Sequence, residues 1–221
     1  MRRKSKMNRV KGIGALLLAG VFSFGLSSGQ HSKLGKDGLA IGKKMPMGNY
    51  EMIGADDATY TLNDLKKDNG LIVVFSCNTC PFVVGSDSFE GWEGQYNTIY
   101  EKAQANNIGM VLVNSNAAKR DGVDSKEAMA SHKEALGYQM PYVIDTDAQL
   151  ADAVGAKTTP HVYMFDGKGK LVFKGSIDNS WDTKREQLET YLFDAIAAIG
   201  SGTDIPVNSS APRGCSIKRL K

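Results

Sequence analysis

Cysteine and proline are both scarce, with three and six residues among 221. So few prolines, together with a hydrophobic content of 42%, exclude a disordered or fibrous protein. The chain also lacks internal repeats and low-complexity blocks. Its length predicts one globular domain of ordinary size with extensions.

The chain also lacks an excess of positive charge outside its N-terminal segment. The formal charge of +3 is misleading, because six of the 27 Lys and Arg residues lie in the first 11 positions, where there is no acidic residue. In the rest of the chain acidic residues outnumber basic ones by three. We therefore predict no nucleic-acid partner.

No apolar run in the N-terminal region reaches the ~20 residues that a transmembrane helix needs. Residues 12–26, GIGALLLAGVFSFGL, follow the basic start and precede Ser27, Ser28 and Gly29. This pattern predicts a signal peptide over residues 1–29 and export to the periplasm or another extracytoplasmic compartment. The alternative is an uncleaved leader that holds the chain to a membrane through residues 12–26.

Four segments follow from composition and hydrophobic pattern. After the leader, residues 30–40 are polar and glycine-rich, which predicts a flexible tether; residues 41–200 form the domain, and residues 201–221 form a C-terminal tail with Cys215. Within the domain we expect two short strands around a turn at 55–57 and a helical turn near 63. We further expect strands at 71–75, 108–114, 161–165 and 171–177, and helices from 89, at 125–136, at 147–154 and from 183.

Cys77 and Cys80 stand three residues apart in VVFSCNTCPFVVG, directly after the buried strand at 71–75. A structural disulfide is a weak explanation, because so small a ring constrains little of the unfolded chain. A metal site is also weak, because zinc needs four ligands and the other candidates, His31, His132, His161 and Cys215, are scattered. We therefore predict no metal or other cofactor, and redox exchange is favoured.

The order strand, CxxC, helix, strand, helices, hairpin, helix is the layout of a thioredoxin-like domain. The sequence resembles the redoxin branch of that superfamily, the alkyl hydroperoxide reductase and thiol-specific antioxidant type. The resemblance spans roughly residues 41–215 and rests on VVFSCNTCPF, PYVIDTDAQLADAVGAKTTPHVYMFD, KLVFKGSID and GCSIK. It implies an α/β fold, a three-layer α/β/α sandwich with a mixed central sheet.

The resemblance also implies a thiol-disulfide oxidoreductase with an antioxidant or redox-homeostasis role. A helix starting at the CxxC would direct its N–H groups at the first sulfur, so Cys77 is the expected nucleophile and Cys80 the resolving thiol. Thr159 and Pro160 match the cis-proline position that lines the bound substrate in this superfamily. The expected partners are a disulfide-containing protein substrate and a thiol electron donor.

The motif and its strand depart from thioredoxins, which carry Trp before the first cysteine and Gly-Pro between the two. This chain has Ser76 and Asn78-Thr79 there, and its strand lacks the buried acid of thioredoxins. The alternative activity is a thiol-dependent peroxidase. Peroxiredoxins place Pro and Thr seven and three residues before the reactive cysteine, and neither Cys77 nor Cys80 has that pair.

Cys215 has two interpretations. It is an unpaired tail thiol without a catalytic role, since cysteines are often buried for packing alone. Alternatively GCSIK folds back, so that Cys215 resolves or regulates the CxxC pair as an accessory redox residue. The sequence does not decide between them.

Overall fold

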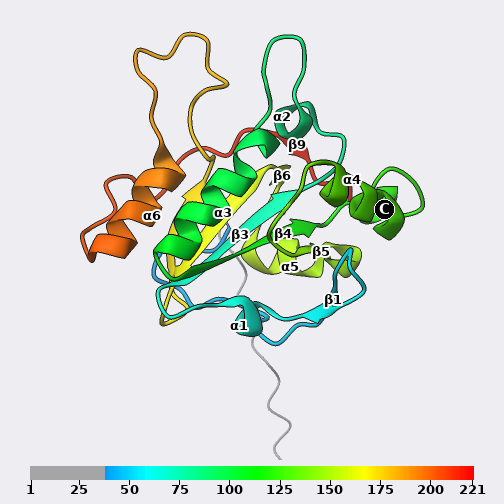
Figure 1. Cartoon of the computed structure of the whole chain (residues 1–221), viewed down its shortest axis with the longest axis horizontal. Coiled ribbons are helices and arrows are strands. Elements are labelled where there is room, and N and C mark those ends of the chain that lie inside the picture. The colour runs from blue at the N-terminus through cyan, green and yellow to red at the C-terminus, as the bar shows by residue number, and fades with distance from the viewer. Residues whose placement is uncertain (1–37) are drawn as a thin grey trace, which may run out of the picture. The chain divides into compact units, whose positions relative to one another are not determined.

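The centre of the protein is a mixed sheet of five strands in the order β5-β4-β3-β7-β8 (Figure 1). A computed structural model describes residues 38–221, so the predicted leader lies outside the described residues. β3, β4 and β5 run parallel, whereas β7 and β8 are antiparallel to their neighbours. The bounds are β3 Gly70–Ser76, β4 Ile108–Asn114, β5 Tyr142–Ile144, β7 His161–Asp166 and β8 Leu171–Gly175.

Helices cover both faces of this sheet. Alternate residues of the central strands enter two separate apolar clusters, as Ile72 and Val73 do, because successive side chains of a strand point to opposite faces. One cluster packs against α3 Tyr96–Ala105, α4 Lys126–Ala135 and α6 Tyr191–Ser201; the other packs against α1 Leu62–Leu65 and α5 Gln149–Val154. The three-layer α/β fold with a mixed sheet is therefore confirmed.

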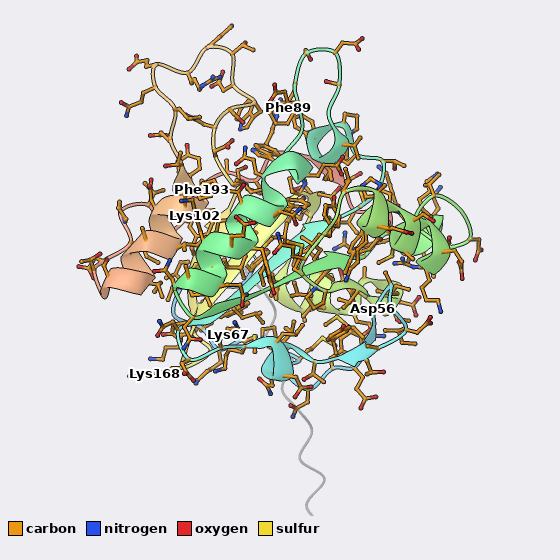
Figure 2. The ribbon with its side chains drawn as sticks, in the orientation of Figure 1. Asp56, Lys67, Phe89, Lys102, Lys168 and Phe193 are labelled. Carbon is orange, nitrogen blue, oxygen red and sulfur yellow. The ribbon has the colours of Figure 1, made fainter. Side chains whose placement is uncertain are left out.

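α3 and α6 lie side by side on the first face (Figure 2). The Lys102 ammonium sits 6.0 Å from the centre of the Phe193 ring and links the two helices at their outer surface. At such exposed sites a cation over an aromatic ring contributes about 0.5–1 kcal/mol. Burial of Ile99, Ala103 and Leu192 between helices and sheet contributes much more.

The remaining elements are short. β1 Met52–Ile53 and β2 Thr59–Tyr60 pair around the predicted turn, and α1 follows at the predicted helical turn. α2 Pro81–Val84 comes directly after the cysteines, and β6 Thr158–Thr159 pairs with β9 Cys215–Ser216. Three 3₁₀ turns, η1 Glu93–Gln95, η2 Ala117–Lys119 and η3 Thr146–Ala148, complete the order. Across residues 38–221, no helix has the length and apolar character to span a bilayer.

The helix predicted from residue 89 begins only at Tyr96. Gly91 has φ +81°, outside helical geometry, and a Cβ there would lie 2.4 Å from the Val83 carbonyl oxygen. The chain therefore turns tightly between α2 and α3, although Trp92 is fully buried as its apolar spacing predicts. The apolar stripe identified the core residues correctly and the start of the helix wrongly.

The last helix also starts later than predicted, at Tyr191 instead of near residue 183. Side chains in the preceding segment bond their own backbone: Asp182 accepts the Lys184 N–H at 2.9 Å, and the Arg185 guanidinium donates to the Ser180 carbonyl at 3.0 Å. Such local bonds compete with helix formation. Thr183 and Glu186, which have the spacing of a capping box, therefore lie before the helix.

Candidate functional site

Cys77 lies where β3 ends, at the edge where the parallel strand β4 also ends. Ser76 pairs with Asn114 in the register, so the residues that follow each strand meet at one edge of the sheet. The carboxyl ends of parallel strands are the usual place for sites in such folds. α2 and β9 lie together at this end of the domain (Figure 1).

Both cysteines of the motif are free thiols, and each is 3% exposed. Thr159 contacts both: its hydroxyl lies 3.3 Å from the Cys77 sulfur, and its carbonyl oxygen lies 2.9 Å from the Cys80 sulfur. The Thr159–Pro160 peptide bond is cis, as the resemblance implied. The structure thus brings together the four residues expected at the site's centre.

The two thiols share one negative charge. Burial disfavours the charged form of either thiol. The Thr159 carbonyl opposes charge on Cys80 in particular, because it accepts from a thiol and repels a thiolate. At 2.9 Å we take this contact to decide the proton's position, so the proton is on Cys80 and the charge is on Cys77. The Thr159 hydroxyl and the Thr79 N–H then donate to Cys77.

The helix after the motif differs from the expectation. α2 has four residues, Cys80 is its N-cap, and it ends at Gly85, where φ is +97°. The helix does start at the CxxC, but its N-cap is the second cysteine, three residues beyond Cys77, and so short a helix has a small dipole. Local donors, rather than a long helix, stabilise charge on Cys77.

Cys215 lies at the same site. The tail returns so that Cys215 pairs with Thr159 in the β6–β9 register. The Cys215 N–H donates to the Cys80 sulfur at 3.4 Å. Burial, with the nearby Cys80 sulfur, raises the pKa of Cys215 to about 11. The expectation that GCSIK folds back onto the pair is confirmed for its position.

A buried polar network holds the dipeptide between the cysteines, and it includes residues that the sequence did not single out. Asp124, which is fully buried, accepts the Asn78 N–H at 3.0 Å. It also accepts from the Asn114 and Asn116 side chains, at 2.8 and 2.9 Å. Asn78 in turn accepts from the Tyr142 hydroxyl at 2.9 Å. Asn114 and Asn116 could have been found from their place at the end of β4, but nothing local marks Asp124.

Two buried tyrosines, Tyr96 and Tyr142, lie next to the site. The Tyr96 hydroxyl and the Ser76 hydroxyl hydrogen-bond at 2.9 Å, and Tyr142 receives a bond from Asn114 at 3.0 Å. Burial, with the nearby Cys77 charge, raises the pKa of both Tyr96 and Tyr142, so their hydroxyls stay protonated. Ser76, which replaces the thioredoxin tryptophan, therefore serves as an anchor for α3.

His161 packs beside the site rather than in it. It is 5% exposed, its ring centre lies 4.6 Å from that of Tyr163, and its Nδ1 has no partner within residues 38–221. His132 bonds Glu93 at 2.8 Å on α4's surface. Within the same residues, no group of three or more His, Cys, Asp or Glu side chains is arranged to hold a metal ion.

The chain is similar to one protein family and to several solved structures. The family model described as Redoxin matches residues 40–192. An uncharacterized conserved protein from Geobacillus kaustophilus has a similar structure, with 29% identity and a TM-score of 0.73 over 82% of this chain and 93% of that one. A hypothetical protein from Sinorhizobium meliloti 1021 follows, with 24% identity and a TM-score of 0.69 over 82% and 96%.

A peroxidoxin, BcpB from Mycobacterium tuberculosis, shares the fold at 13% identity, with a TM-score of 0.53 over 74% of this chain and 97% of that one. No curated protein gives a significant match.

Proposed function

The chain belongs to the Redoxin family of thioredoxin-like oxidoreductases, and from this premise we propose that it catalyses thiol-disulfide exchange through Cys77 and Cys80. The observation that carries the proposal is the arrangement of two free thiols, both in contact with Thr159, against the cis Thr159–Pro160 bond. A disulfide-containing protein is the proposed substrate, and a thiol reductant restores the pair.

The reaction has two steps. The Cys77 thiolate attacks one sulfur of the substrate disulfide, which forms a mixed disulfide and releases the other substrate sulfur as a thiolate. Cys80 then loses its proton and attacks the Cys77 sulfur, which forms the Cys77–Cys80 disulfide and releases the second substrate thiolate. The substrate gains two electrons and the pair loses two; the reverse sequence oxidises a dithiol.

The contacts around each sulfur support this order. Cys80 is enclosed by the chain's own groups, namely the Thr159 carbonyl, the Cys77 side chain and Cys215. Cys77 accepts from the Thr159 hydroxyl and the Thr79 N–H, which stabilise its charge. Since both sulfurs are nearly fully buried, an incoming disulfide has to displace some covering group before it reaches Cys77.

The test is insulin-type disulfide reduction by the full-length chain with dithiothreitol as donor. We expect Cys77→Ser to abolish turnover, whereas pre-reduced Cys80→Ser, mixed with insulin after dithiothreitol is removed, stops at one mixed disulfide that mass spectrometry detects. Ser88→Ala, an exposed substitution beyond α2, is the matched control and should keep wild-type turnover. Turnover that survives both cysteine substitutions would refute the proposal.

Peroxide reduction is the second candidate activity. A thiolate at Cys77 with two hydrogen-bond donors is the group that attacks a peroxide oxygen, so the same variants are assayed for hydrogen peroxide consumption. Consumption that survives Cys80→Ser but requires Cys215 would favour the peroxidase activity over protein disulfide exchange.

We further propose that the protein is exported. The support is the basic start, the apolar run at 12–26 and the small residues up to Gly29. N-terminal sequencing of protein recovered from the extracytoplasmic fraction should begin at Gln30. Recovery of the whole pool with an intact N-terminus in the cytoplasm would contradict export.

A further inference from the structure

We propose that Cys215 is a third redox thiol that attacks Cys80 in the oxidised pair. The disulfide between Cys77 and Cys80 is then replaced by a disulfide between Cys80 and Cys215. The inference rests on the proposed exchange at Cys77 and Cys80. It assigns the C-terminal tail a chemical role in the same site.

The first support is the closeness of the tail to the pair. The Cys215 N–H donates to the Cys80 sulfur at 3.4 Å, and Cys215 pairs with Thr159, whose carbonyl oxygen lies 2.9 Å from the same sulfur. This backbone bond from Cys215 to the Cys80 sulfur brings the two thiols within reach of exchange. Cys77 has no such contact with Cys215 within residues 38–221, so Cys80 is the sulfur that Cys215 attacks.

The second support is a glycine that the close approach requires. A Cβ at Gly214 would lie 2.2 Å from the Thr159 carbonyl oxygen and 3.1 Å from the Pro160 nitrogen. Because φ at Gly214 is not in the left-handed region, the requirement is space rather than backbone conformation. Glycine allows the tail to lie directly on the cis Thr159–Pro160 segment and brings Cys215 to the sulfurs.

The third support is that the tail is fixed on both sides of Cys215. Before it, the Arg213 N–H donates to the Ser176 hydroxyl at 3.0 Å, and the Arg213 guanidinium lies 4.6 Å from the centre of the Trp181 ring. After it, Ile217 is 5% exposed in the core, and the Lys218 N–H donates to Asn116 at 2.8 Å. Asn116 also bonds Asp124, so one network holds both the tail and Asn78.

The step conserves atoms and electrons. Cys215 gives its proton to solvent, and its thiolate attacks the Cys80 sulfur of the Cys77–Cys80 disulfide. The Cys80–Cys215 bond forms as the Cys77–Cys80 bond breaks, and Cys77 leaves as a thiolate. No external oxidant is consumed. Cys77 is then again a thiolate that can attack a second substrate disulfide, while the disulfide from the first turnover is held between Cys80 and Cys215.

The test follows the disulfides directly. Full-length protein is oxidised with a small excess of diamide, alkylated with N-ethylmaleimide in denaturant, and digested with trypsin. The sequence gives Cys77 and Cys80 on one peptide, residues 68–102, and Cys215 on the peptide GCSIK, residues 214–218. A Cys80–Cys215 bond therefore appears as a cross-linked pair of these peptides, whereas the Cys77–Cys80 bond does not.

Cysteine variants assign the bond. We expect the cross-link in wild type and Cys77→Ser, and its absence in Cys80→Ser. Gly214→Ala should reduce the cross-linked fraction by roughly tenfold, because it lowers the effective concentration of Cys215 at Cys80. Gly94→Ala, at a position with no atom within 4 Å of the added Cβ, is the matched control and should leave it unchanged.

Two outcomes would overturn the inference. One is a Cys77→Ser protein that stays uncross-linked although its circular dichroism matches wild type. The other is a wild-type protein whose Cys77–Cys80 bond forms fully while GCSIK remains alkylated. Failure of the proposed function looks different, since Cys77→Ser would then leave substrate turnover unchanged whatever the state of GCSIK.

Discussion

Replacing Asp124 with alanine tests whether the buried network next to the cysteines holds the motif in place. The side chain is fully buried and accepts hydrogen bonds from the Asn78 N–H and the Asn116 side chain, for which no other acceptor is present within residues 38–221. It also accepts from Asn114, which keeps the Tyr142 hydroxyl as a second partner. Removal of the carboxylate therefore leaves one buried donor, on Asn116, and one partly buried donor, the Asn78 N–H, unsatisfied.

The expected loss in the free energy of unfolding follows from these two donors. A buried donor left without a partner costs about 1–3 kcal/mol, so Asp124→Ala should lower the free energy of unfolding by about 4 kcal/mol. Asp124→Asn keeps the volume and one acceptor oxygen, so about half that loss is expected. Because a domain of this kind is stable by about 5–15 kcal/mol, either change is a large fraction of the total.

Urea denaturation of full-length protein, followed by circular dichroism, measures the free energy of unfolding. The control is Asp121→Asn, an exposed aspartate in the same loop, which should change it by less than about 0.5 kcal/mol. The Asp124 variants should also shift the Cys77–Cys80 reduction potential, because the Asn78 N–H loses its anchor. A loss below about 1 kcal/mol for Asp124→Ala would refute the argument.

Three further predictions concern the core. Burial, with Lys174 and Lys157 nearby, lowers the pKa of His161 to about 3, so stability is fully present above the ordinary value near 6.5 and falls as the pH drops. Between pH 7 and 5 we expect urea denaturation to show a loss of about 2 kcal/mol that His161→Gln removes; equal slopes in the two proteins would contradict this. Gly109→Ala should cost about 1–3 kcal/mol in the same assay, since its Cβ would lie 2.0 Å from the Leu65 carbonyl oxygen, and Gly94→Ala should be nearly neutral. If Gly109→Ala leaves the free energy of unfolding unchanged, the contact between α1 and β4 is not as close as the structure has it. Asp178→Ala should lower the thermal midpoint and alter Trp92 fluorescence, because the buried indole N–H donates to Asp178 at 2.6 Å; an unchanged melt would argue against that bond.

Much of the fold was predictable because its elements are marked by local patterns. The apolar run of β3, the cap Ser125 before α4 and the stop at Gly155 after α5 each act within a few residues. The errors occurred where a nearby competitor acts against a helical pattern: Gly91 before α3 and the side-chain bonds of Asp182 before α6. Predictions on the leader and the tether stay predictions, since they lie mostly outside residues 38–221.

The candidate site divides in the same way. The sequence by itself determined that Cys77 and Cys80 follow a buried strand, because motif spacing and strand order are properties of the chain, and its family resemblance implied that Thr159–Pro160 faces them. Only the tertiary structure decided that Cys215, 135 positions from Cys80, rests on that sulfur, and that Asp124 holds Asn78. The physical reason is that those contacts join segments far apart in the chain, and packing of the tail on β6 and of the β4 loop on the motif fixes them.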